Sequence, residues 1–273
     1  MLKTRIITAL LLIAGFIPLL FMVSNTAWAI VTLIISLLAV YEWGELVDLS
    51  KFANKIFTFI CLLLGCAFLF FMNKSGTHWM IYQSLFVFVI TLAFWVLVTP
   101  VLLTKIIIVN NKFLLSLIGF FILAPLWLAL VSLKAINPLL LLALLTTIWI
   151  ADTMAYFTGK HFGKHKLAPS ISPGKTWEGV LGALLGVTLF AAILYFTNLV
   201  ETWAIFPLLW VVALLGVIGD LFESLIKRQV NKKDSGSLLP GHGGILDRVD
   251  GLLPSLPISL LFIYLFNYFQ VGA

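Results

Sequence analysis

Residues 203–228 read WAIFPLLWVVALLGVIGDLFESLIKR, and this stretch decides the fold class. No charged side chain occurs between Trp203 and Gly219, and charged residues then follow at once, beginning with Asp220. An α-helix needs about 20 mainly apolar residues to cross the hydrocarbon core of a bilayer. The stretch therefore predicts a membrane-spanning helix whose last turns are polar.

The rest of the chain has the same character. Of its 273 residues, 62% are hydrophobic and only 10% are charged, whereas soluble domains carry about 25% charged residues. This composition excludes a soluble globular protein, and it excludes disorder and coiled coil, which both need abundant charge. A membrane β-barrel is unsuitable because its strands alternate polar and apolar residues, while the apolar runs here are continuous. We predict an all-α polytopic integral membrane protein.

About nine transmembrane helices are predicted, in a single membrane domain over residues 1–273. Charged or turn-rich breaks separate them, for instance at Ser24 to Thr26 and at Asn73 to Gly76. Residues 1–134 hold the N-terminal transmembrane helices, and residues 135–273 hold most of the polar motifs. The predicted spans are approximately 5–23, 26–46, 55–72, 78–98, 113–133, 138–158, 177–197, 203–226 and 251–270.

The distribution of basic residues predicts which way the helices point. Lys and Arg gather in the short cytoplasmic loops of membrane proteins. With alternating spans, all but two of the 17 Lys and Arg residues fall on the side of the N-terminus, the exceptions being Lys74 and Lys134. We therefore predict a cytoplasmic N-terminus and a C-terminus outside. The one-sided charge also suits anionic lipid heads or a nucleotide polyphosphate, although topology alone accounts for many of these residues.

The polar end of the stretch at 203–228 is the first candidate site. An ionised residue at the centre of a membrane helix costs about 2.5–3.5 kcal/mol on insertion scales, so such residues are functional candidates. Asp220, Glu223, Ser224 and Lys227 are spaced to share one helix face. A helix end that is simply wet would explain Lys227 and Glu223. It explains Asp220 poorly, because that residue lies about two turns inside.

Two other predicted spans carry acids. Asp152 and Tyr156 share one face of the span at 138–158, and a structural hydrogen bond between helices is the alternative to a functional role. Glu42 and Glu45 close the span at 26–46. For this pair an ordinary interfacial position and a supporting role near the site both stay open.

The loop at 159–176 offers a phosphate grip. Ser172, Lys175 and Thr176 stand just before a predicted helix, and hydroxyls and a lysine at a helix start suit phosphate. The Gly-Lys-Thr ending is similar to a P-loop but fails its spacing, because Pro169 occupies the position of the leading glycine. A plain helix N-cap explains Thr176 equally well.

The loop at 227–251 is densely charged and rich in glycine. Asp247 and Asp250 would share a face if their segment is helical, and with Asp220 they could form a cage of hard oxygen ligands for Mg²⁺. No cluster of Cys and His suggests zinc. A membrane site with acids for a divalent cation and basic residues for phosphates suits phosphoryl or nucleotidyl transfer to a lipid, in which positioning and charge neutralisation supply most of the rate.

The same loop resembles a known family. Its pattern is Ser224-x-x-Lys227-Arg228, then Lys233-Asp234-x-Gly236, then Pro240-x-His242-Gly243-Gly244-x-x-Asp247-Arg248-x-Asp250. This pattern closely resembles the signature of the phosphatidate cytidylyltransferases, or CDP-diacylglycerol synthases. Asp152 to Tyr156 and the segment from Ser172 to Gly179 are similar to that family too, so the likeness covers about 150 to 251. One departure is Gly174, where the family often has a basic or polar residue.

The resemblance implies an activity: CTP and phosphatidic acid give CDP-diacylglycerol and pyrophosphate for phospholipid biosynthesis, with Mg²⁺ and room for a second cation. Residues 135–273 would then be the catalytic half of a multi-pass protein of the bacterial inner (plasma) membrane, with its active site on the cytoplasmic side. The resemblance also implies a homodimer, although the sequence shows no interface, and no nucleic-acid partner.

The resemblance implies roles for individual residues as well. The expected catalytic residues are Asp220, Asp247, Lys227, Arg228 and His242, although a structural role for His242 in its glycine turn is equally open. The expected substrate-binding residues are Ser172, Lys175, Thr176, Ser224, Lys233, Arg248, Asp152 and Tyr156. The expected metal ligands are Asp220 and Asp247, with Asp250 as the weaker candidate.

Three rival functions remain. A CDP-alcohol phosphotransferase would need an Ala-Arg after Asp250-Gly251, where this chain has other residues. A CTP-dependent lipid or polyprenol kinase differs in its products, because only a cytidylyltransferase releases pyrophosphate and leaves CMP on the lipid. A transporter would place polar residues through the whole membrane depth, whereas the ionisable residues here collect on the predicted cytoplasmic side.

Overall fold

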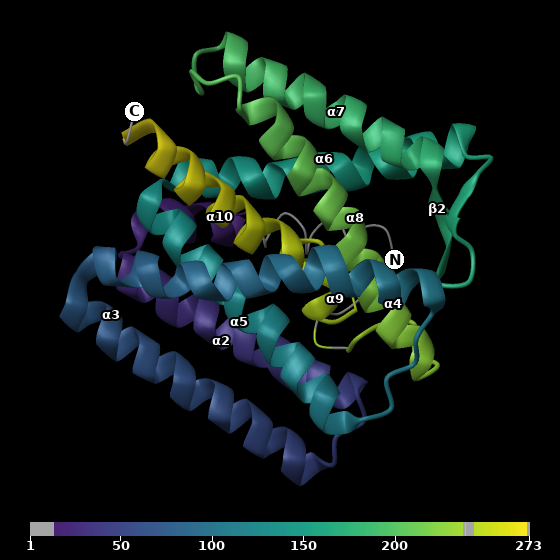
Figure 1. Ribbon diagram of the computed structural model, residues 1–273, viewed down its shortest axis with the longest axis horizontal. Helices are drawn as coiled ribbons and strands as arrows, with labels where there is room; N and C mark the ends of the chain where they lie inside the picture. The colour runs from purple at the N-terminus through teal and green to yellow at the C-terminus, as the bar shows by residue number, and fades with distance from the viewer. Residues whose placement is uncertain (1–13, 237, 239–242, 272–273) are drawn as a thin grey trace.

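The computed structural model describes residues 14–236, 238 and 243–271, and helices dominate it (Figure 1). The elements in chain order are α2 (Asn25–Leu46), α3 (Lys51–Ala93), η1 (Phe94–Val98), α4 (Thr99–Lys105), α5 (Lys112–Ile136), α6 (Pro138–Phe162), β1 (Lys166–Ala168), β2 (Ser172–Thr176), α7 (Trp177–Phe196), α8 (Ile205–Gln229), α9 (Leu246–Val249) and α10 (Leu252–Val271). In the described part of the chain, eight helical segments are long and apolar enough to cross a membrane. The all-α polytopic fold is confirmed.

The first predicted span, 5–23, lies largely outside the described residues. Its part at residues 14–22 is helical. The other predicted spans correspond to described helices, with shifts of a few residues at their ends. The largest shifts concern α3 and α4.

Polar residues at the predicted breaks begin several helices. The hydroxyl of Ser24 accepts from the N–H of Ala27 at the start of α2, and Ser50 caps α3 in the same way. The side-chain oxygens of Asn111 and Asn137 do this for α5 and α6. Such a side chain satisfies an N–H group that the first helical turn leaves unpaired.

One predicted break is wrong, because the chain stays helical through Asn73–Gly76 within α3. Figure 1 shows α3 as two arms that meet at one edge of the molecule. The arms form two candidate spans, Lys51–Met72 and Leu85–Lys105. The polar stretch does not end the helix because residues such as Asn and Ser cost a helix less than about 0.7 kcal/mol each.

The second of these spans ends at Lys105, beyond the predicted end at residue 98. Pro100 has no N–H and cannot donate to the carbonyl one turn before it. The π-helical turn η1 precedes this proline, and the hydroxyl of Thr99 donates to the carbonyl of Phe94 at 3.2 Å. A π turn is one of the usual ways in which a helix absorbs such an interruption.

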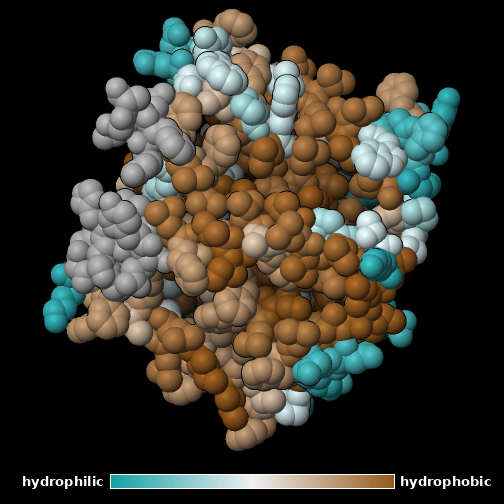
Figure 2. Space-filling model, viewed as in Figure 1, coloured by the Kyte–Doolittle hydropathy of each residue, from teal (hydrophilic) through white to brown (hydrophobic). Residues whose placement is uncertain are grey.

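The helices α6 and α7 contact each other more extensively than any other pair, because glycines on α7 let the two backbones approach closely. A Cβ atom on Gly182 would lie 2.1 Å from the hydroxyl of Thr158, and one on Gly186 would lie 2.5 Å from Met154. Elsewhere α10 packs against α8 and α5, and α2 packs against α5. Figure 2 shows the resulting surface, on which apolar residues cover most of the face and hydrophilic ones lie mainly at its margins.

The residues at 159–176, predicted as a loop, contain a short antiparallel hairpin. In it β1 pairs with β2, with Lys166 opposite Thr176. The hydroxyl of Thr176 accepts from the N–H of Gly179 at 3.1 Å. Thr176 is therefore the N-cap of α7, which was the alternative to phosphate binding. The hairpin projects from the same side of the molecule as the end of α4 (Figure 1). Both ends belong to the side predicted to be cytoplasmic.

Candidate functional site

A polar cavity of about 640 Å³ lies between α6, β2, α7 and α8. Six residues that the sequence singled out line it together: Asp152, Tyr156, Ser172, Lys175, Thr176 and Asp220. They come from three separate stretches of the chain. The close packing of α6 on α7 brings the first of these stretches to the hairpin, and α8 closes the other side.

An ion pair lies at the wall of this cavity. The ammonium of Lys175 lies 2.7 Å from Oδ2 of Asp220, and the two side chains remain 21% and 38% exposed. Lys175 also donates to the carbonyl of Val217 at 3.3 Å, and the hydroxyl of Ser224 donates to Oδ1 of Asp220 at 3.2 Å. The pair is therefore held in place yet accessible to a charged molecule in the cavity.

Two further lysines line the cavity, Lys160 and Lys166, and both were predicted only to set the topology. The ammonium of Lys160 lies 5.7 Å from the centre of the Tyr156 ring, within cation–π range. The signal was present in the spacing, because Asp152, Tyr156 and Lys160 follow one another at intervals of four residues on α6.

The polar face of α8 that carries Asp220, Glu223, Ser224 and Lys227 turns toward the protein interior at its C-terminal end. Glu223 is 0% exposed, and Lys227 is buried as well. The Lys227 ammonium lies 2.7 Å from Oε2 of Glu223 and 2.7 Å from Oδ1 of Asp247. The alternative that Glu223 and Lys227 lie at a helix end exposed to water is therefore wrong. The segment around α9 folds over this end of α8.

A group of four residues that we call the cradle lies around the other oxygen of Asp247, and two of them donate to it. The backbone N–H and the hydroxyl of Ser235 donate to Oδ2 at 2.9 and 3.0 Å, and the N–H of Gly244 donates at 2.8 Å. Gly243 has a φ of +79°, a conformation that suits glycine. A Cβ atom at Gly243 would also lie 2.6 Å from Oδ2. The cradle consists of Ser235, Gly236, Gly243 and Gly244.

Glu42 reaches this region from α2, in the N-terminal part of the chain. Its side chain is 1% exposed, and Oε2 accepts from the N–H of Leu246 at 2.9 Å. Glu42 is therefore not an ordinary exposed residue at the membrane interface, which was one of the two alternatives for it. Glu45 is exposed, and its backbone carbonyl accepts from the ammonium of Lys232 at 3.1 Å.

The remaining predicted site residues lie around these two centres. The guanidinium of Arg228 donates to the carbonyl of Ile171 at 3.3 Å, next to β2. Asp250 accepts from the N–H of Gly251 at 2.8 Å. Lys233 and Arg248 are exposed, and the charge of Arg248 acts on Asp152. His242 lies outside the described residues.

The acids on α8 and near α9 suit a divalent cation by their chemistry. Glu223 interacts electrostatically with both Asp220 and Asp247, and Asp250 interacts with Asp220 and Glu223. These acids outnumber the paired lysines Lys175 and Lys227, and Oε1 of Glu223 is buried without a hydrogen-bond partner. The donors are all hard oxygens, the kind that Mg²⁺ prefers.

The acids are nevertheless engaged with protein groups. Within the described ranges no three of the acid, His or Cys side chains are gathered as a ready metal site. Asp220 pairs with Lys175, and Asp247 pairs with Lys227. A cation would therefore have to replace a lysine at one or both aspartates.

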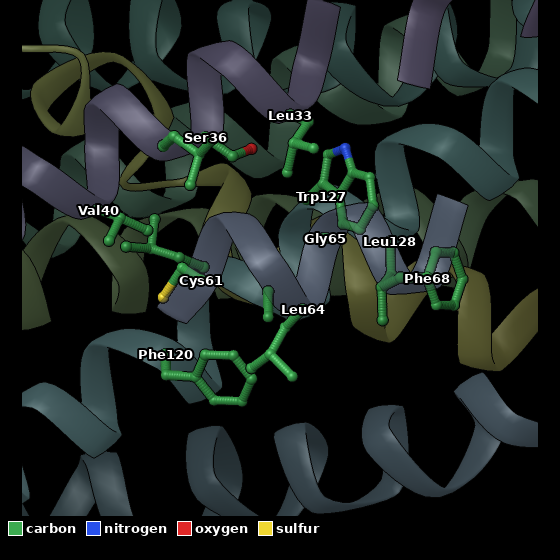
Figure 3. Close-up of a pocket in the computed structure, with 13 residues that line it drawn as sticks. Leu33, Ser36, Val40, Cys61, Leu64, Gly65, Phe68, Phe120, Trp127 and Leu128 are labelled. Atoms are coloured by element: carbon green, nitrogen blue, oxygen red, sulfur yellow. The ribbon is translucent and has the colours of Figure 1, made fainter. Parts of the chain in front are cut away.

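A second cavity, of about 210 Å³, is apolar and lies between α2, α3 and α5. Figure 3 shows Cys61 and Ser36 at its wall among aliphatic and aromatic side chains such as Trp127. Ser36 and Cys61 offer little that could bind a charged group. This cavity is unlike the polar one between α6 and α8, and the two cysteines of the chain are free.

Comparison with known proteins identifies the family of the chain. The model of a family described as the cytidylyltransferase family matches residues 3–266. A phosphatidate cytidylyltransferase of Pseudomonas aeruginosa is 36% identical over 268 residues, which cover 94% of this chain and 95% of that protein. The protein of the same name from Haemophilus influenzae is 33% identical, over 97% of this chain and 99% of its own length. Because the similarity extends over nearly the whole sequence, the chain belongs to the cytidylyltransferase family.

Proposed function

We propose that this protein transfers CMP from CTP to phosphatidic acid and so forms CDP-diacylglycerol and pyrophosphate. The observation that carries the proposal is the polar cavity at the end of membrane-spanning helices, lined by Lys160, Lys166 and Lys175 beside Asp152 and Asp220. A lipid phosphate and a nucleoside triphosphate must meet in a polar site at the membrane surface. Relatives that cover nearly the full length are named phosphatidate cytidylyltransferase.

In this reaction an oxygen of the phosphatidate phosphate attacks the α-phosphorus of CTP. A new P–O bond forms there as the bond to the β-phosphate breaks, and pyrophosphate leaves with its charge. No side-chain nucleophile is required, so the protein acts by position and charge. Lys160, Lys166 and Lys175 bind phosphate oxygens in the cavity, and Tyr156 lies at its wall.

The ion pair between Lys175 and Asp220 gives these residues a defined role. An arriving phosphate competes with Asp220 for the ammonium of Lys175, which lies 2.7 Å from that carboxylate. Once Lys175 turns to the phosphate, Asp220 becomes available. Lys227 is paired with Glu223 and Asp247 at the neighbouring end of the site, and a cation bound at Asp247 would compete with it there.

Mg²⁺ is part of the proposal. Asp220 and Asp247 would hold it, with Asp250 as the weaker candidate, and a second cation is part of the proposal. When bound, the ion would neutralise charge on the triphosphate and on the leaving pyrophosphate. The hard oxygen donors of the acids on α8 and near α9, among them the buried and unpaired Oε1 of Glu223, support this assignment.

The cellular setting is proposed on similar grounds. The relatives are bacterial, and we place the protein in the inner (plasma) membrane with the cavity facing the cytoplasm, where CTP is available. The homodimer rests on the family resemblance alone. Density-gradient separation of inner and outer membranes, together with chemical cross-linking of the purified protein, tests both statements.

The deciding experiment is an assay of the purified protein in detergent micelles containing phosphatidic acid. With CTP and Mg²⁺, we expect pyrophosphate release matched by CMP-labelled lipid, and loss of both when EDTA is added. A lipid kinase would instead release CDP and phosphorylate the lipid. A CDP-alcohol phosphotransferase would consume CDP-diacylglycerol and release CMP. Failure to consume CTP in active micelles would reject the proposed reaction.

A further inference from the structure

The carboxylate of Glu42 is one of two buried carboxylates in the described residues that have an oxygen without a hydrogen-bond partner. It is 1% exposed, and its Oε1 atom has no hydrogen-bond partner. An unsatisfied buried polar atom costs about 1–3 kcal/mol, which an apolar packing residue at this position would avoid. Its other oxygen, Oε2, accepts from the N–H of Leu246 at 2.9 Å. Glu42 therefore contacts the residue directly before Asp247.

The cradle also rests directly on this carboxylate. A Cβ atom added to Gly236 would lie 2.6 Å from Oε1 of Glu42, and one added to Gly244 would lie 2.5 Å from Oε2. Backbone can come this close only where a residue lacks a side chain. Glu42 thus contacts the cradle on one side, while the cradle donates to Asp247 on the other.

The neighbours of Glu42 are fixed to the rest of the fold. Trp43 donates through its indole N–H to the carbonyl of Leu115 at 2.9 Å, and its ring stacks on Phe222 with centroids 6.4 Å apart. Phe222 precedes Glu223 on α8. Position 42 is therefore held rigidly relative to the helix that carries Glu223 and Lys227.

We propose that Glu42 is a positioning residue for the reaction: it holds the cradle and the start of α9 so that Asp247 meets Lys227. The contact passes from Glu42 to Leu246 and the cradle, then to Asp247, and then to Lys227, which lies 2.7 Å from Asp247. Glu42 is buried and does not line the polar cavity. The inference rests on the proposed function only in the tests that use the reaction rate.

The first test uses hydrogen exchange followed by mass spectrometry and needs no activity. Glu42→Ala removes the acceptor for Leu246, so the peptide over residues 243–250 should exchange about 10-fold faster or more, while peptides of α6 and α7 stay unchanged. Glu45→Ala is the matched control, because Glu45 is exposed on the same helix end. Unchanged protection of 243–250 in Glu42→Ala overturns the proposal.

The second test measures kcat and KM with CTP and phosphatidic acid. Glu42→Ala should lower kcat about 10- to 100-fold, the usual loss when a residue that orients a site residue is removed, with KM for CTP nearly unchanged. Glu42→Gln keeps an amide oxygen for Leu246 and should lose less. A Gln variant as impaired as the Ala variant would show that the hydrogen bond is not what matters, and would reject the role.

A double-mutant cycle separates positioning from general damage. If Glu42 acts through Asp247, then Glu42→Ala should lower kcat only slightly further in a protein that already carries Asp247→Asn. Independent, additive losses contradict the proposal.

If Glu42→Ala does not fold, Gly244→Ala serves instead, because its Cβ would lie 2.5 Å from Oε2 of Glu42. Gly251→Ala is its control, since the nearest atoms there lie 3.5 Å away.

The two hypotheses fail in different ways. A wild-type protein that releases no pyrophosphate defeats the proposed function and leaves the exchange result to decide on Glu42. An active wild type whose Glu42→Ala variant keeps both normal kcat and normal protection defeats the positioning role alone.

Discussion

At the residue scale, Asp220 and Asp247 have different surroundings. Asp220 lies at the wall of the polar cavity and is 38% exposed, whereas the side chain of Asp247 is 9% exposed and is bound on both oxygens. Asp220 pairs with Lys175, which is proposed to bind a phosphate, whereas Asp247 pairs with Lys227. Their loss should therefore disturb the charge balance of the reaction in different places.

We expect Asp220→Ala and Asp247→Ala each to lower turnover by about 10²–10³-fold, the size of effect seen when one electrostatic contact in an active site is removed. Pyrophosphate release from CTP measures the loss, and yield in the membrane fraction checks insertion. Glu201→Ala is the control, because Glu201 is an exposed acid outside the site and its motifs. Near-normal turnover in either test variant removes that aspartate from the site.

The sequence predicted which residues would matter better than it predicted their partners. Asp220 and Lys175 were both singled out, yet their ion pair joins two stretches whose distance no local pattern encodes. The sequence leaves the role of Glu42 open because its partner, Leu246, contributes only a backbone N–H, which every residue except proline carries. Lys160 was overlooked because topology already explained its charge.

At the element scale, the pair of helices α6 and α7 fixes one wall of the cavity. A Cβ atom on Gly182 would lie 2.1 Å from the hydroxyl of Thr158, so Gly182→Ala must separate the helices or displace Thr158. Overpacking of this kind costs about 1–3 kcal/mol.

We therefore expect Gly182→Ala to lower the thermal unfolding midpoint in detergent and to reduce activity as the cavity is distorted. Gly174→Ala provides the comparison, because a Cβ atom at Gly174 meets nothing within 4 Å. Equal midpoints for the two variants would mean that the close approach of α6 and α7 is not needed for stability.

Long helices were predicted well, because continuous apolar stretches of membrane length have few other solutions. Short features were not. The hairpin of β1 and β2 is three and five residues long, too short for an alternating pattern to stand out. The continuation of α3 through Asn73 was missed because a polar stretch indicates a turn only weakly.

At the scale of the whole molecule, the predicted orientation can be tested with single cysteines. Lys134, one of the two basic residues predicted outside, is only 4% exposed and donates to Val23 and Asn25, so it is a poor probe. Lys74 is exposed and better suited.

In a background with Cys61→Ser and Cys66→Ser, we expect Lys74→Cys to react with a membrane-impermeant maleimide added to spheroplasts. Asp234→Cys should react only after the membrane is opened. The physical reason is the one-sided distribution of Lys and Arg, which sets orientation during insertion. The reverse pattern would invert the topology and move the cavity to the outer face.

The site depends on contacts that span almost the entire chain, and this is why its geometry could not be predicted from motifs alone. Glu42 on α2, Lys175 on β2, Lys227 on α8 and Asp247 on α9 each contribute from a different segment. The division predicted at residue 134 stays a prediction, and the hydrogen bond between Glu42 and Leu246 crosses it.

The contact between Glu42 and Leu246 also has a consequence for biosynthesis. The two residues are separated by 204 positions, and a ribosome adds about 5–20 residues per second. The carboxylate of Glu42 is therefore in the nascent protein for about 10–40 s before its partner has been made. Until then the acid must stay hydrated near the bilayer surface, so the site can be completed only as one of the last events of translation.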